Sequence, residues 1–102
     1  MPHRARGTRR LYEQNAAILL RDAVACSWCF RPISTALPRG HPQKATADHY
    51  VPLSLGGSDQ LGNLVPACAE CNSQRGNRSP AAFVAFLVKV GKRPKPASSR
   101  DW

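Results

Sequence analysis

Apolar residues recur at helical spacing in two segments of the chain, one near each end. In residues 9–25 they form a single stripe, as expected for a helix with one buried face. The stripe consists of Tyr12, Ala16, Leu19 and Ala23. Thr8 stands just before this segment, where its hydroxyl can cap the amino end of a helix. We therefore predict a helix over residues 9–25 whose stripe packs into the core.

The second segment, which follows Ser79, has the clearest helical pattern in the chain. Ser79 suits the N-cap, Pro80 suits the first turn and Gly91 suits the stop. The apolar positions at i, i+3, i+4 and i+7 are Phe83, Phe86, Leu87 and Val90. Val84 and Val88 widen this face, and we interpret the extra apolar surface as part of the core rather than as a dimer or partner contact. A helix is predicted from this pattern up to residue 90.

The middle of the chain alternates short apolar runs with prolines and glycines. Repeated prolines predict a loop over residues 30–44. Short runs predict strands over residues 45–50 and 63–66, which a loop containing proline and glycine joins into a hairpin. Residues 69–75 contain no proline and stop at Gly76, which predicts a short helix. The order of these elements indicates a small α+β domain.

The length of 102 residues allows only a modest core, so we expect one small domain that needs a staple. Residues 1–7 combine arginines with a proline and a glycine, and they are expected to form a flexible basic arm. The domain is expected over residues 8–91 and a basic tail rich in proline and serine over residues 92–102. No signal peptide and no apolar stretch of about 18 residues is visible, so we expect a cytoplasmic protein of a bacterium or a phage-infected host.

Fifteen lysines and arginines stand against six acidic residues, which leaves a formal net charge of +9. A field of this strength gathers polyanions, so nucleic acid is the expected partner and an acidic membrane surface is the alternative. The placement of the charges favours nucleic acid, because arginines stand on both sides of the segment that carries the candidate chemistry. The arginines expected to contact phosphates are Arg9, Arg10, Arg75 and Arg78.

The four cysteines form two pairs, Cys26-Ser-Trp-Cys29 and Cys68-Ala-Glu-Cys71. Both sulfurs of one such turn can reach the same tetrahedral ion, so two turns complete a structural zinc site with four thiolates. Disulfides or a redox role are the alternatives, and a basic chain without a visible signal peptide favours metal. His41 could replace one cysteine, although four thiolates already suffice. Between Cys29 and Cys68 lie 38 residues, against about 15 to 20 in a continuous zinc ribbon, and this long insert is where a function is expected.

The insert carries the dipeptide Asp48-His49 near the end of the first predicted strand. Adjacent strand residues point to opposite faces, so both side chains can approach one metal only where the strand bends or ends. The proline and the glycines that follow make such a bend reasonable. A hydrogen-bonded surface histidine is the alternative interpretation.

Asn72 directly follows the last cysteine, and its amide oxygen is a suitable ligand for a hard cation. Arg75 stands three residues later on the same helical face, where its guanidinium could bind a phosphate beside that ligand. The alternatives are a helix-capping or surface asparagine and arginines that are simply solvated, Arg78 included.

Together these pieces resemble the HNH endonuclease family in its four-cysteine zinc subtype, over residues 26–78. The matching pieces are Cys26-Ser-Trp-Cys29, Asp48-His49-Tyr-Val-Pro-Leu, Gly56-Gly57-Ser, Asn63-Leu64 and Cys68-Ala-Glu-Cys71-Asn72. The resemblance implies a zinc-stapled beta-beta-alpha metal core, also called a His-Me finger, which would be flanked here by an N-terminal and a C-terminal helix.

By this resemblance, His49 is the general base, Asp48 binds the catalytic divalent metal and Asn63 braces the loop that aims the histidine. Asn72 stands where the family often has a histidine. The family accepts asparagine there, and an oxygen donor moves the metal preference toward Mg²⁺ or Mn²⁺. His49 would take a proton from the attacking water while the metal holds the phosphate, and the products would carry a 5′ phosphate and a 3′ hydroxyl.

The expected function is therefore hydrolysis of DNA phosphodiester bonds with weak sequence specificity, since no base-reading constellation is visible. The alternative is a non-catalytic, zinc-stabilised DNA-binding or assembly module, in which the matches at the catalytic positions are accidental or decayed. Small free-standing members of the family occur in phages beside DNA-packaging genes. The resemblance thus suggests a packaging partner such as a terminase.

Overall fold

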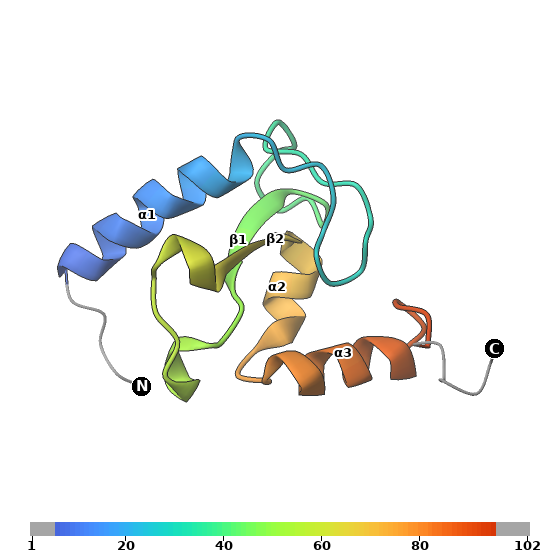
Figure 1. Ribbon diagram of the computed structural model, residues 1–102. Coiled ribbons are helices and arrows are strands. Elements are labelled where there is room, and N and C mark those ends of the chain that lie inside the picture. The colour runs from blue at the N-terminus through green and yellow to red at the C-terminus, as the bar shows by residue number, and fades with distance from the viewer. Residues whose placement is uncertain (1–5, 96–102) are drawn as a thin grey trace.

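The computed structural model of the protein describes residues 6–95. Within these residues the fold has three α-helices and one two-stranded antiparallel sheet, which confirms the small α+β class (Figure 1). In chain order the elements are α1 (Arg6–Leu20), β1 (Ala45–His49), β2 (Leu64–Cys68), α2 (Ala69–Arg75) and α3 (Pro80–Lys89), with the 3₁₀ helices η1 (Leu53–Leu55) and η2 (Leu61–Asn63) between the strands. None of the helices in this part of the chain is long and apolar enough to cross a membrane.

The hairpin of β1 and β2, with α2 directly after it, lies at the centre of the molecule (Figure 1). Ala45 pairs with Cys68 and His49 pairs with Leu64, so β1 ends beside the start of β2. The N-cap of α2 is Cys68, whose sulfur accepts a hydrogen bond from the backbone N–H of Cys71. The predicted hairpin and short helix are confirmed, with small shifts in the strand boundaries.

Helix α1 differs from its prediction at both ends. It begins before Thr8, which lies inside the helix rather than at the N-cap, so the last residues of the expected arm over residues 1–7 are helical and the others lie outside the described residues. It ends at Leu20 instead of residue 25, because Ala25 pairs with Pro32 in an isolated bridge. The turn that holds the first cysteine pair therefore overrides the helical pattern of the sequence.

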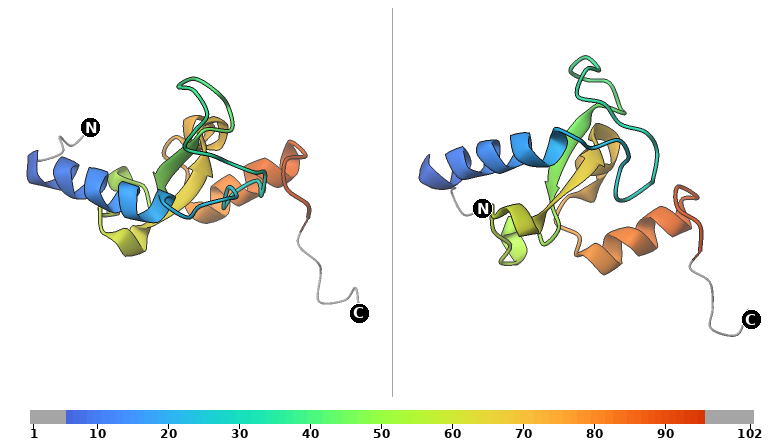
Figure 2. Two further views of the ribbon diagram at one scale, coloured as in Figure 1. Left: turned by 90° about the horizontal axis from the view of Figure 1, so that it is seen from above. Right: turned by 45° about the horizontal axis from the view of Figure 1, so that its top comes forward.

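Helices α1 and α3 lie on opposite sides of the hairpin (Figure 2). The inner face of α3 belongs to the core, where Phe83 and Leu87 are fully buried. The hydroxyl of Ser79 accepts a hydrogen bond from the first turn at 3.2 Å, as an N-cap should. Val90, which we expected on the buried face, is 48% exposed, because α3 ends at the residue before it.

The start of the expected tail packs against the domain. The ammonium of Lys92 donates to the carboxylate of Glu70 in α2, and the guanidinium of Arg93 donates to the carbonyl of Trp28 at 3.3 Å. Lys92 and Arg93, which we assigned to the tail, therefore contact the domain. Residues 96–102 lie outside the described part of the chain.

Candidate active site

The four cysteines meet between the loop after α1 and the start of α2. Their sulfur atoms all lie within 4.8 Å of one another. Cys29 Sγ and Cys68 Sγ are 3.8 Å apart. A tetrahedral site with Zn–S bonds of about 2.3 Å requires a separation of about 3.8 Å. All four thiols are free rather than joined in disulfides, and they could hold a metal ion such as zinc.

Backbone N–H groups of the two turns point at the sulfurs. Trp28 N donates to Cys26 Sγ at 3.4 Å and Cys71 N donates to Cys68 Sγ at 3.3 Å. Hydrogen bonds from the Cys68 and Cys71 thiols lower the pKa of Cys26. The hydrogen bond to Cys26 raises the pKa of Cys68 to about 11, and the bonds to both partners raise the pKa of Cys71. A metal ion binds cysteines as thiolates, so binding at this cluster would release the protons that the thiols share.

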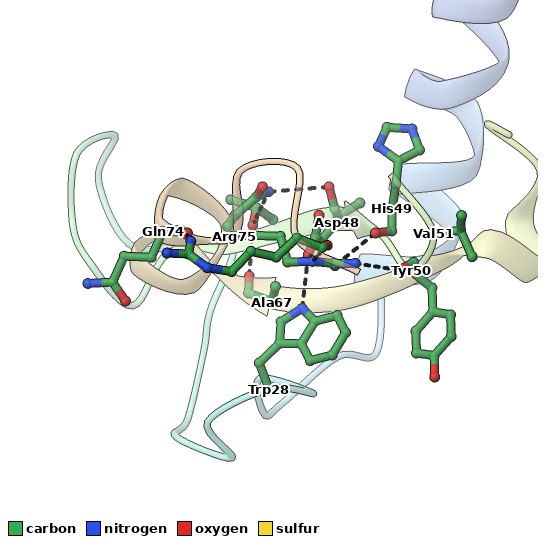
Figure 3. A network of polar contacts seen from close by, with 12 residues as sticks. Trp28, Asp48, His49, Tyr50, Val51, Ala67, Gln74 and Arg75 are labelled. Atoms are coloured by element: carbon green, nitrogen blue, oxygen red, sulfur yellow. Dashed lines mark hydrogen bonds and ion pairs between the residues drawn. The ribbon is translucent and has the colours of Figure 1, made fainter. Parts of the chain in front are cut away.

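Asp48 lies on the face of β1 that α2 covers, between Trp28 and Arg75 (Figure 3). Its Oδ2 accepts a hydrogen bond from Trp28 Nε1 at 2.9 Å and one from Arg75 Nη1 at 2.8 Å. Burial raises the pKa of Asp48, and the nearby Arg75 offsets only part of that effect. Both of these hydrogen bonds fall on Oδ2, so Oδ1 is the oxygen that could accept a further ligand.

Arg75 is only 1% exposed, although it stands in the last turn of a surface helix. Besides Asp48, its guanidinium binds three carbonyl oxygens, those of His49 at 3.0 Å, Tyr50 at 2.5 Å and Arg78 at 2.8 Å. This placement corrects the expectation that Arg75 contacts a phosphate, because its donors are directed at a buried carboxylate and at the backbone that leaves β1. The sequence alone does not distinguish this buried arginine from a solvated one.

His49 points away from Asp48 and toward α1 (Figure 3). Its Nε2 lies 2.7 Å from Oδ1 of Asp59. Its ring stacks on that of Tyr12, with centroids 5.2 Å apart and planes inclined by 22°. The Tyr12 hydroxyl donates to the carbonyl of Ala47 at 2.7 Å. These contacts hold the ring in place. The side chain of His49 is 15% exposed, so the ring still reaches solvent.

Asn63 closes the loop between the strands. Its Oδ1 accepts from Val51 N at 2.9 Å, and its Nδ2 donates to the carbonyls of Val51 at 3.0 Å and Ser58 at 2.8 Å. A Cβ atom at Gly57 would come within 1.8 Å of the Val51 carbonyl oxygen, so only glycine fits there. One amide side chain therefore holds both arms of the loop together.

Asn72 faces β1 from α2. Its Nδ2 donates to Thr46 Oγ1 at 3.0 Å and lies 3.4 Å from the carbonyl oxygen of Ala47. The Thr46 hydroxyl itself donates to Ala67 O at 2.9 Å, so its oxygen is an acceptor for Asn72. These contacts fix the orientation of the amide, with Nδ2 rather than Oδ1 facing Thr46 and Ala47. Asn72 thus lies beside the two residues that precede Asp48.

The profile of the HNH endonuclease family matches residues 26–78, just over half of the chain. The matched segment contains both cysteine pairs, the hairpin and α2. The chain belongs to the HNH endonuclease family. Membership gives it a nuclease-type function in general, with nucleic acid as the substrate.

The HNH chain is also similar to the phenylalanine–tRNA ligase beta subunit of Rhodopseudomonas palustris, with 34% identity over 91 residues. The similarity covers 86% of this chain and 11% of that protein, so the chain spans about a tenth of the length of the relative. A match to so small a part indicates a shared segment and carries no activity over to this chain.

Three of the arginines expected to contact phosphates lie at the surface of the HNH protein. Arg9 and Arg10 are exposed on α1, and Arg9 stands one helical turn before Tyr12. Arg78 is exposed after α2, and its guanidinium lies 4.4 Å from the ring centroid of Phe86. The first pair therefore lies on the His49 side of the hairpin and the third lies beside α3.

Three residues around the histidine were missed from the sequence, namely Tyr12, Asn15 and Asp59. Asp59 follows the glycines of the matched motif pieces, and that position was a usable signal. Tyr12 belongs to the apolar stripe of α1 and was assigned to the core. No local pattern reveals that its ring meets an imidazole contributed by a distant strand.

Proposed function

We propose that this HNH protein is a metal-dependent DNA endonuclease with His49 as its general base. The observation that carries the proposal is the end of β1, where Asp48 and His49 leave the strand in opposite directions. Asn72 contacts the backbone just before Asp48. A base and a pair of oxygen ligands on the two sides of one strand end can flank a bound phosphodiester.

Asp48 and Asn72 are the residues that would hold a divalent ion. A carboxylate and an amide oxygen are hard donors, and two protein ligands suit Mg²⁺ or Mn²⁺, which also takes waters and a phosphate oxygen. When bound, such an ion would offset the negative charge that develops on the phosphate and on the leaving 3′ oxygen. Trp28 and Arg75 both donate hydrogen bonds to Oδ2 of Asp48, so the carboxylate is oriented before a metal binds to Oδ1.

His49 would take a proton from water while the water oxygen bonds to phosphorus and the bond to the 3′ oxygen breaks. Proton transfer by a positioned side chain typically contributes about 10²- to 10⁴-fold to the rate. Hydrolysis in this direction leaves a 5′ phosphate and a 3′ hydroxyl. Asn63 would act indirectly, through the loop that it closes.

Zinc at the four cysteines would be structural, because four thiolates fill a tetrahedral shell and leave no open position. The exposed Arg9, Arg10 and Arg78 would contact the DNA backbone, which positions a protein without reading sequence. We therefore expect weak specificity. A phage DNA-packaging partner such as a terminase rests on the family resemblance alone and is not needed for the reaction.

The test is cleavage of supercoiled plasmid by the wild type and by His49→Ala, each with Mg²⁺, Mn²⁺ or a chelator. The wild type should cleave only with metal. The variant should lose at least about 100-fold in rate, because it lacks the base, and should keep its zinc and its affinity for duplex DNA. His41→Ala is the matched control and should cleave normally. A wild type that never cleaves would favour the non-catalytic DNA-binding module, and cleavage by His49→Ala at the wild-type rate would remove His49 from this role.

Substitutions at Asn72 test the metal site separately. Asn72→Ala should lose most activity, because Asp48 alone would hold the ion poorly. Asn72→His should stay active with its best metal shifted toward Mn²⁺, Ni²⁺ or Co²⁺, since imidazole is a softer donor. Ser73→Ala, an exposed neighbour, is the control. Equal Mg²⁺-dependent rates for the wild type and Asn72→Ala would show that Asn72 is not a ligand.

A further inference from the structure

His49 has two neighbours that take no part in the proton transfer from water. Asp59 lies 2.7 Å from Nε2, and Tyr12 stacks against the face of the ring. Within residues 6–95, the other ring nitrogen, Nδ1, makes no hydrogen bond. The two nitrogens of the imidazole are therefore in different surroundings.

This difference selects one form of the imidazole. An ionised carboxylate can only accept hydrogen bonds, so the nitrogen of His49 that faces Asp59 must carry a proton. In the neutral ring the other nitrogen then holds the lone pair, which is the form that a general base needs. A carboxylate in this position also stabilises the imidazolium that forms once the base has taken a proton.

Asp59 is a supported residue rather than a mobile surface acid. It is 5% exposed, and its backbone carbonyl accepts a hydrogen bond from Asn15 Nδ2 of α1 at 2.9 Å. The preceding carbonyl, that of Ser58, accepts from Asn63 Nδ2 at 2.8 Å. The loop is thus held at two consecutive residues, once by α1 and once by the residue before β2, so the carboxylate is presented to His49 by a fixed backbone.

Helix α1 completes this support. Tyr12 stacks on the imidazole and binds the backbone of β1 through its hydroxyl, while Asn15, three residues later, binds the loop of Asp59. Residues three apart in a helix share a face, so one face of α1 contacts the strand, the base and the acid together. This helix lies outside the segment matched by the HNH family. The site of this chain therefore includes an element that the family profile does not cover.

We propose that Asp59 is a positioning residue that orients His49 for DNA cleavage, supported by α1 through Asn15 and Tyr12. This inference rests on the proposed endonuclease function and deepens it. In the step, the water oxygen bonds to phosphorus, the bond to the 3′ oxygen breaks, and the proton of the water moves to Nδ1 of His49. The 3′ oxygen takes a proton from solvent. Asp59 keeps its hydrogen bond to the Nε2 proton throughout and does not touch the substrate.

Asp59→Asn tests the proposal, because a carboxamide has the same shape but can donate to the ring as well as accept from it. With a duplex oligonucleotide and Mg²⁺, kcat should fall at least about 100-fold while KM changes little. Asp59→Glu should recover part of the rate. The matched control is Asp22→Asn, which removes the same charge from an exposed acid paired with Arg21 and should leave kcat unchanged.

Two further measurements separate positioning from a merely structural role. In the His49→Ala background, Asp59→Asn should have no additional effect on the rate, because its contribution acts through the missing ring. Nitrogen-15 NMR of the imidazole should show the tautomer protonated at Nε2 in the wild type and a mixture in Asp59→Asn. A structural role would instead lower the rate by the same factor in both backgrounds and leave the tautomer unchanged.

The possible failures are distinguishable. If the wild type does not cleave, the proposed function fails and this inference fails with it. If the wild type cleaves and Asp59→Asn matches its kcat, the inference about Asp59 alone is overturned. The same holds if the tautomer of His49 does not depend on Asp59, or if Asp59→Asn lowers the rate equally with and without His49.

Discussion

Asp48 and His49 are neighbours in the sequence, yet the structure holds them in two different ways. Asp48 is fixed by Trp28, which belongs to the buried cluster that contains the four cysteines, and by the buried Arg75, which lies over the Trp28 ring. His49 is fixed on the opposite face of β1 by Asp59 and by a helix in which none of residues 9–20 is fully buried. One face of the strand belongs to the core, and the other is assembled at the surface.

This difference separates stability from reactivity. A change on the Asp48 face leaves a buried charge without its partner or removes a cysteine that could hold the metal, so we expect it to destabilise the whole domain. A change on the His49 face alters how one ring is held, and we expect it to lower activity with little effect on stability.

The largest effect is expected from Cys68→Ser. Thiolate zinc sites contribute on the order of 10 kcal/mol or more to small domains, which matches or exceeds the stability expected of a core this size. The variant should be unfolded by circular dichroism and should contain no zinc by elemental analysis. Ser73→Ala in the same helix should remain folded with one zinc per chain. A folded Cys68→Ser protein without zinc would show that the clamp does not sustain the Asp48 face.

The next effect is expected from Arg75→Met, which leaves the buried Asp48 without its cation. Breaking a buried ion pair from one side typically costs about 3 to 5 kcal/mol, measured here as the free energy of unfolding in urea. Asp48→Asn in the same chain should recover part of the loss, because no buried charge then remains. Arg78→Met is the exposed control and should cost less than about 1 kcal/mol. Similar losses for the two arginines would contradict the buried role of Arg75.

A smaller effect is expected on the other face from Tyr12→Phe, which keeps the stacked ring and removes the hydrogen bond to Ala47. The free energy of unfolding should fall by about 1 kcal/mol. Tyr12→Ala also removes the stack, and its cleavage rate should fall by a larger factor than that of Tyr12→Phe. If Tyr12→Phe destabilised the domain as much as Arg75→Met does, the proposed division between the two faces would be lost.

The smallest effect concerns DNA affinity rather than stability. Each of Arg9→Gln and Arg10→Gln should reduce the slope of log affinity against log salt by about 0.9, the change expected for one lost phosphate contact on duplex DNA. Fluorescence titrations at several salt concentrations would measure it. Arg75→Lys should leave the slope unchanged if it folds, since that side chain lies inside the protein. An unchanged slope in both α1 variants would show that this end of α1 does not meet the backbone.

Local patterns in the sequence were sufficient for much of the fold. The N-cap at Ser79, the buried pair Phe83 and Leu87, and the bounds of α2 were all predicted from patterns within one or two helical turns, and the structure agrees with them. The cysteine spacing likewise predicted that each pair could share one ion, because a short turn brings its two sulfurs together, while the contact of the first turn with β2 brings the two pairs together. Helix α1 ends earlier than its pattern predicts, because the residues after it form the first cysteine turn, and that turn is stabilised by tertiary contacts.

The surroundings of the candidate site were decided only by the tertiary structure. Arg75 and Asp48 are 27 residues apart in sequence, and Tyr12 and Ala47 are 35 apart. No periodicity links such positions, because their contact depends on how the hairpin, α1 and α2 pack together. The alternation of a strand made opposite faces the default for Asp48 and His49, a bend being the other possibility, and the structure keeps the two side chains on opposite faces. Tertiary packing decided which residue each side chain contacts: Asp48 binds the buried Arg75, and His49 binds Asp59.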